Sequence, residues 1–85
     1  MGQAGNDIDQ LIREEKRLTA VESQTEAWAE GLSAGIEPEI IAEAALSTAL
    51  LELLRTESES AAIALIERMK ERILAGEFGP SATRH

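Results

Sequence analysis

The segment EPEIIAEAALSTALLELLR, from Glu37 to Arg55, decides the fold class of this 85-residue chain. It is expected to form one helix. At 100° per residue, Ile40 and Ile41 face away from the glutamates of the first two turns. Two turns later the apolar side has moved to the other face, where it consists of Leu46, Leu50, Leu53 and Leu54. A helix that is apolar on almost every side needs more cover than one neighbouring helix provides, so the sequence predicts that a second copy of the chain covers it.

The length and the cysteine content of the chain limit how it can be stabilised. An 85-residue chain forms a single domain, and folded alone it buries only roughly 60% of the surface that its unfolded form exposes. It contains no cysteine, so neither a disulfide nor a thiolate metal site can reinforce it. Oligomerisation is the remaining means of stabilisation. A cytoplasmic location is the default expectation.

The charge of the chain argues against nucleic acids and membranes as partners. The net charge is −8, and residues 21–60 hold nine acidic side chains but a single basic one. Such an acidic surface repels phosphate groups, so binding to nucleic acid or to an anionic membrane is not expected. The longest run without a formal charge, residues 44–51, is far shorter than the ~20 residues that span a bilayer. The same charge would attract a basic protein partner.

A first helix is expected over residues 7–33, with Asn6 or Asp7 as its N-cap. Its apolar side chains recur at a seven-residue spacing, which is typical of a narrow seam that lies along another helix. The seam consists of Leu11, Leu18, Thr25 and Leu32, with Val21 and Trp28 at the offset positions and Glu14 interrupting it. Gly31 and Gly35 indicate the turn that ends the helix, although their spacing would also allow close approach of a second helix.

Two further helices follow. Pro38 suits the first position of a helix, so the second helix is expected over residues 38–55. Thr56, followed three residues later by Glu59, matches the capping-box pattern and predicts a third helix over residues 57–75 that ends at Gly76. This third helix has one apolar stripe, formed by Ala62, Leu65, Ile66, Met69 and Ile73. The connection between the second and third helices is so short that they are expected to form a tight antiparallel hairpin.

The predicted fold class is therefore all-α, with three helices assembled as a helical-bundle homodimer. Residues 7–76 form the single helical domain, and residues 1–6 and 77–85 are expected to be a flexible N-terminus and a flexible C-terminal tail. Residues 38–79 resemble small acidic helical proteins of bacteria, and this resemblance implies no particular activity.

The residues needed for catalysis are largely missing. The chain has no cysteine nucleophile, and its one histidine is His85 in the predicted tail. The serines lack the sharp strand-to-helix turn or the local base that would activate them. No glycine-rich phosphate loop is expected, because no strand precedes one. The sequence therefore predicts a protein that is not an enzyme, with no catalytic and no cofactor-binding residues.

Two groups of charged residues could form other sites. Glu22, Glu26 and Glu30 share one face of the first helix and could collect a divalent cation. Because no histidine accompanies them, a solvated acidic face is the preferred interpretation, and no metal site is expected. The basic cluster of Arg13, Lys16 and Arg17 could bind an acidic partner, but the acids beside it favour a solvated helix face with local ion pairs.

The leading hypothesis is a small self-associating protein, a homodimer or a tetramer, that acts through protein contacts. Trp28 either covers a helix pair or anchors a partner, and these roles coincide if the seam is the subunit interface. The predicted interface residues are Leu18, Val21, Trp28, Leu32, Leu46, Leu50, Leu53 and Leu54. The alternative is a monomeric adaptor or an antitoxin-like acidic regulator, whose apolar face would be a groove for a basic or helical protein partner.

Overall fold

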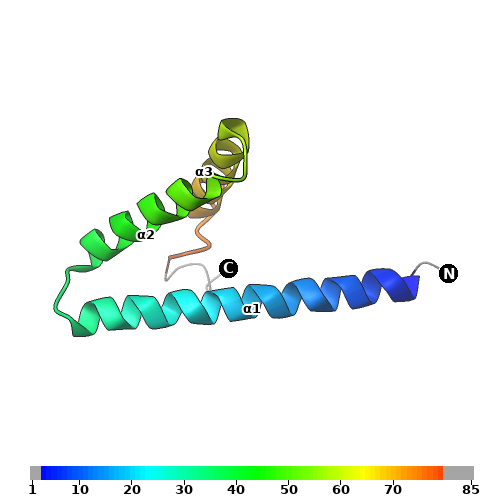
Figure 1. The fold of residues 1–85 in the computed structure, drawn as a ribbon, viewed down its shortest axis with the longest axis horizontal. Helices are drawn as coiled ribbons and strands as arrows, with labels where there is room; N and C mark the ends of the chain where they lie inside the picture. Colours follow the sequence, from blue (N-terminus) through cyan, green and yellow to red (C-terminus); the bar gives the residue numbers. More distant parts are fainter. Residues whose placement is uncertain (1–2, 80–85) are drawn as a thin grey trace. The chain divides into compact units, whose positions relative to one another are not determined.

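The computed structural model describes residues 3–79, and within them every secondary-structure element is a helix (Figure 1). Helix α1 covers Gln3–Ser33, α2 covers Pro38–Leu53 and α3 covers Glu59–Leu74. The prediction of an all-α chain with three helices is confirmed. Of the predicted flexible ends, residues 1–2 and 80–85, including His85, lie outside the described part.

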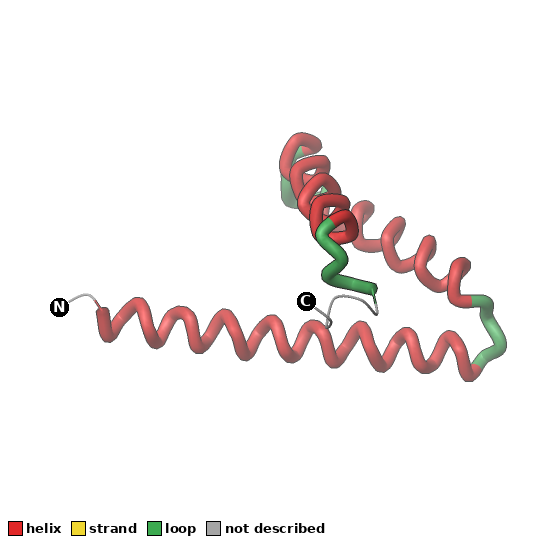
Figure 2. Tube along the Cα trace, turned by 180° about the vertical axis from the view of Figure 1, so that it is seen from behind, coloured by secondary structure: helices red, strands yellow, loops and turns green. Residues whose placement is uncertain are grey.

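The chain divides into two units, one that ends at Glu43 and one that begins at Ala44. The first turns of α2 belong to the first unit with α1, and the remainder of α2 belongs to the second unit with α3. The two connections between helices are residues 34–37 and 54–58, and both are short (Figure 2). Each unit contains one of these turns.

Helix α1 begins earlier than predicted. It starts at Gln3, so Asn6 and Asp7 lie inside the helix and neither is the N-cap that the sequence suggested. Glutamine and alanine are good helix formers, and the residues Gln3 and Ala4 therefore extend the helix beyond the first polar residues that could have capped it. The helix is 31 residues long and ends at Ser33, as predicted.

The turn that ends α1 is a Schellman motif. Gly35 adopts the left-handed conformation, with a φ of 86° that other residues adopt only at a cost. Its N–H donates to the carbonyl of Leu32 at 2.9 Å, and the N–H of Ile36 donates to the carbonyl of Gly31 at 3.1 Å. These two hydrogen bonds satisfy carbonyls that the end of a helix would otherwise leave without partners.

Helix α2 begins at Pro38, as predicted, because proline has no N–H and therefore suits the first position of a helix. The carbonyl of Glu37 accepts hydrogen bonds from the N–H groups of Ile40 and Ile41, at 3.0 and 3.1 Å. Ile41 packs against the last turn of α1 at Gly31. A Cβ atom placed on Gly31 would lie 2.7 Å from Cδ1 of Ile41, so any side chain at this position would displace the isoleucine side chain.

The boundary between α2 and α3 differs from the prediction. Helix α2 ends at Leu53 and α3 starts at Glu59, so the predicted capping role of Thr56 is wrong. The N-cap is Ser58, whose Oγ accepts a hydrogen bond from the N–H of Ala61 at 3.1 Å. Thr56 belongs to the turn after α2 instead, because its N–H and its hydroxyl both donate to the carbonyl of Leu53.

Helix α3 carries the one buried residue among those described, Ala62, which is 5% exposed. Leu65 and Met69 on the same stripe are half-buried. The helix ends in a second Schellman motif, in which Gly76 has a φ of 81° and its N–H donates to the carbonyl of Ile73 at 3.0 Å. Gly76 therefore stands where the sequence predicted it.

Candidate interaction surface

Within its own unit, the apolar side of α1 is uncovered. We call its large members, Leu11, Leu18, Val21, Trp28 and Leu32, the α1 seam. Their exposed fractions range from 38% at Trp28 to 67% at Leu11. From residue 7 to residue 33 no side chain is buried, and only Gly31 is half-buried. Within its own unit, the helix thus leaves its apolar side chains uncovered along most of its length.

Two polar residues interrupt the α1 seam. Glu14 and Thr25 occupy positions of the seven-residue repeat on the same side as the leucines. The side chains that flank the seam differ in charge: at 100° per residue, one flank holds Arg13 and Arg17, and the other holds glutamates. These glutamates are Glu15, Glu22 and Glu26.

The basic cluster of α1 makes no ion pair within the part of the chain that the structure describes. The ion pairs found there are Arg55 with Glu52, Lys70 with Glu67, and Arg72 with Glu77. The local ion pairs expected for Arg13, Lys16 and Arg17 are therefore absent from this structure.

The second unit carries an apolar hollow of about 240 Å³. Its lining joins residues from the end of α2 and the turn after it with residues from the first turns of α3. The lining residues are Leu50, Leu54, Glu59, Ala62, Ile63 and Ile66. Because Glu59 is the one charged side chain among them, the hollow combines an apolar floor with a negative charge.

The predicted interface residues fall into two groups. In the described structure, those that are exposed are Leu18, Val21, Trp28, Leu32, Leu46 and Leu54, and those that are half-buried are Leu50 and Leu53. The sequence prediction did not include the exposed side chains of Ile8, Ile12 and Leu51. Ile8 and Ile12 lie one turn apart, which is a visible signal, but they fall outside the seven-residue repeat.

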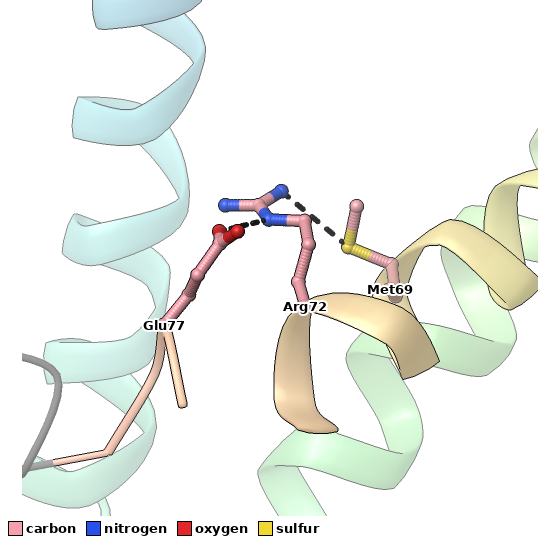
Figure 3. A network of polar contacts seen from close by, with 3 residues as sticks. All are labelled: Met69, Arg72 and Glu77. Atoms are coloured by element: carbon pink, nitrogen blue, oxygen red, sulfur yellow. Dashed lines mark hydrogen bonds and ion pairs between the residues drawn. The ribbon is translucent and has the colours of Figure 1, made fainter. Parts of the chain in front are cut away.

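A polar contact network closes the end of α3 (Figure 3). Arg72 donates from Nε to Oε1 of Glu77 at 2.7 Å and from Nη1 to Sδ of Met69 at 3.8 Å. Its guanidinium carbon also lies 4.7 Å from the centre of the Phe78 ring. All of these partners belong to the last turns of α3 or to the residues that follow them, so the network links the chain after Gly76 to α3.

Two structural features of the described residues concern the geometry of a metal site and the length and apolar character of a membrane-spanning helix. Within residues 3–79, no three His, Cys, Asp or Glu side chains are grouped closely enough to hold a metal ion, and Glu22, Glu26 and Glu30 form no such group. None of the three helices combines the length and the apolar character needed to cross a bilayer.

No family model, curated protein or solved structure matches this chain. The candidate surfaces are therefore the α1 seam and the hollow of the second unit, and both are apolar surfaces bordered by charge. Surfaces of this kind are typical of contacts between proteins.

Proposed function

We propose that this chain is a non-enzymatic protein that self-associates and acts through protein contacts. Its basic assembly is a helical-bundle homodimer, from which a tetramer could form. The observation that supports the proposal best is the exposure of the whole α1 seam in a helix of 31 residues. A helix in water gains most of its stability from packing one face against other elements, and within its own unit α1 has an apolar face without such packing.

The energy available from the α1 seam is large enough to matter. Completely burying a Leu, Val or similar side chain contributes roughly 1.5–3 kcal/mol, so a half-exposed side chain would contribute about 1 kcal/mol more on association. The five members of the seam on each of two copies would then contribute about 10 kcal/mol in total, comparable with the stability of a small domain. This gain opposes an association cost of roughly 4–15 kcal/mol.

Within each copy, we propose that α2 and α3 form an antiparallel hairpin. Two observations support this arrangement. The connection between the helices spans only residues 54–58. Residues from both sides of it, including Leu50 and Ile66, line the same hollow. Helices joined by such a short connection pack side by side in opposite directions.

The hollow of the second unit favours a second candidate function, that of an adaptor or an antitoxin-like acidic regulator. In this case the chain stays monomeric, and the hollow between Leu50 and Ile63 receives the apolar face of a partner helix. Glu59 beside it would favour a basic partner. An open hollow binds a hydrophobic dye at every protein concentration, whereas a surface used for self-association loses dye binding as the concentration rises.

Sedimentation analysis of the full chain over a range of concentrations tests the main proposal. We expect the mass to rise from one to two copies with concentration. Leu18→Glu, which places a charge in the α1 seam, should shift this rise to much higher concentration. Ser23→Glu is the matched control, because Ser23 lies on the opposite side of the same helix and should leave the rise unchanged. A folded monomer at all concentrations would show that the main proposal is wrong.

A further inference from the structure

Over residues 11–28, the order of polar and apolar residues along the α1 seam is symmetric about a point between residues 19 and 20. Leu18 and Val21 stand at equal distances on either side of this point. The polar residues Glu14 and Thr25 come next, and the apolar pair Leu11 and Trp28 follows. All of these side chains except Thr25 and Glu14 belong to the exposed seam. A pattern that is the same from either end suits a helix that packs against its own copy in the opposite direction.

We propose that a second copy of the chain covers the α1 seam with its own α1, antiparallel and in one register. This inference rests on the proposed self-association and adds the surface and the orientation. Leu18 of each copy then faces Val21 of the other, and Leu11 faces Trp28. Glu14 faces Thr25, whose hydroxyl can donate a hydrogen bond to the carboxylate. Over residues 11–28, apolar side chains therefore meet apolar ones and the two polar interruptions meet each other, while at each end of the contact Leu32 faces Asp7.

The alternative antiparallel register disrupts this match. Moving the second copy by one heptad places Leu18 opposite Trp28 but pairs Val21 with Thr25 and leaves Glu14 opposite Leu32. A carboxylate faces Leu32 at the end of the contact in both registers, but the shifted register overlaps only over residues 13–33 and retains fewer apolar pairs, which disfavours it. The symmetric register is the one in which Glu14 meets a hydroxyl group.

A parallel pair would place Glu14 against Glu14 of the second copy within the seam. Interacting helices lie about 8–10 Å apart, and at 8 Å and an effective dielectric constant of about 20 this repulsion would weaken the dimer roughly 30-fold. The antiparallel pair has a smaller opposing effect, since Glu15 then lies beside Glu22 of the second copy at the solvated rim. Each such rim contact weakens association by only about twofold.

The charged flanks partly compensate the parallel pair. In the antiparallel pair each flank of α1 lies beside the same flank of the second copy, so the arginines do not meet the glutamates. In a parallel pair Arg17 would lie beside Glu22 of the second copy. Each such exposed ion pair strengthens association by only about twofold, which does not offset the roughly 30-fold effect of the facing Glu14 carboxylates.

The contact area agrees with a specific but modest interface. In the symmetric register residues 6–33 overlap, a length of about 42 Å at 1.5 Å per residue. With a helix width of about 12 Å, the footprint is about 500 Å² on each copy and about 1,000 Å² in total, which is the lower limit for a specific interface. A helix pair of this size can associate at working protein concentrations and still separate on dilution.

Cysteine cross-linking of the full chain tests the orientation cleanly, because the chain has no native cysteine. Glu14→Cys and Thr25→Cys are made separately, and each is exposed to mild oxidant alone and in an equal mixture. We expect the mixture to yield a disulfide-linked dimer that contains one copy of each variant, identified by its mass. Each variant alone should yield at least tenfold less dimer. Ser23→Cys, on the outer side of α1, is the control and should not cross-link.

Each outcome decides a separate point. If Glu14→Cys cross-links efficiently with itself, the helices are parallel and the inference is overturned. If sedimentation shows dimers but neither the variants nor their mixture cross-link, another surface forms the dimer, and the inference is overturned while the proposed function remains. If the unmodified chain sediments as a folded monomer at all concentrations, the proposed function itself fails.

Discussion

The close packing of Gly31 against Ile41 predicts a specific coupling between substitutions at these two positions. Gly31 lies in the last turn of α1, and Ile41 lies in the second turn of α2, within the same unit. Changing Gly31 to Ala has two opposing effects on the free energy of unfolding. The helix gains about 1 kcal/mol, because alanine loses less backbone entropy than glycine when the helix forms.

The opposing effect follows from the distances. The new Cβ would lie 2.7 Å from Cδ1 and 3.1 Å from Cγ1 of Ile41, so the isoleucine side chain must move. Forcing a side chain away from its preferred rotamer costs about 0.5–1.5 kcal/mol. The two effects nearly cancel, and Gly31→Ala alone should change the free energy of unfolding by less than about 0.5 kcal/mol.

The isoleucine must therefore be removed to reveal the gain. In an Ile41→Ala background, the three atoms nearest to the new Cβ are absent, and Gly31→Ala should stabilise the chain by the full value of about 1 kcal/mol. The double-mutant cycle should thus yield a coupling energy of about 0.5–1.5 kcal/mol, which exceeds the roughly 0.3 kcal/mol seen for independent sites.

Urea unfolding followed by circular dichroism measures this coupling. All variants must be compared at one protein concentration, because self-association makes the apparent stability depend on concentration. Ser23→Ala combined with Ile41→Ala is the matched control, since Ser23 does not approach Ile41, and the two effects should add. If Gly31→Ala and Ile41→Ala also add, the first turns of α2 do not pack on α1 at Gly31 and the reasoning is refuted.

Two further predictions concern the ends of the helices and can be measured by thermal unfolding at a fixed protein concentration. Ser58→Ala should lower the free energy of unfolding by about 1 kcal/mol because it removes the N-cap of α3, whereas Thr56→Val should lower it by less than about 0.5 kcal/mol. Equal losses would mean that Thr56 shares the capping role. Gly35→Ala and Gly76→Ala should each cost about 1–2 kcal/mol, since both glycines have positive φ. Gly76→Asn should cost less, and an equal loss for asparagine would contradict the conformational explanation.

The fold class could be predicted because local backbone chemistry marks most of the helix boundaries. Pro38 lacks an N–H and starts α2, while Gly35 and Gly76 adopt the positive φ that ends α1 and α3. These residues act through their own backbone preferences, which do not depend on distant contacts. The number and the type of the elements were therefore accessible from the sequence.

The cap of α3 could not be chosen from the sequence alone. Thr56 and Ser58 both have side-chain oxygens that suit an N-cap, and the glutamate three residues after Thr56 favoured the wrong one. The structure shows why: the N–H and the hydroxyl of Thr56 both bond to the carbonyl of Leu53, which keeps Thr56 in the turn that ends α2. The choice of the cap therefore depended on hydrogen bonds to the preceding helix, and a pattern of four neighbouring residues contains no information about these bonds.

The candidate surface was predictable in its members but not in its packing. The seven-residue spacing identified Leu18, Val21, Trp28 and Leu32, because it depends only on helix periodicity. It did not identify the contact of Gly31 with Ile41 across the turn. That contact requires the geometry of the Schellman motif at Gly35, which sets the direction in which α2 leaves α1.

The two Schellman motifs show how one backbone arrangement can serve two purposes. In each, a hydrogen bond joins the residue after the glycine to a carbonyl in the last turn of its helix. At the end of α3 these two residues are Glu77 and Arg72, and their side chains form an ion pair that holds the following segment on the same helix. At the end of α1 the equivalent residue in the helix is Gly31, which has no side chain. The side chain of Ile41 occupies the space beside Gly31 that a side chain would otherwise fill. The same motif that is followed by an ion pair within the end of α3 is therefore followed, at the end of α1, by packing of the first turns of α2 on α1.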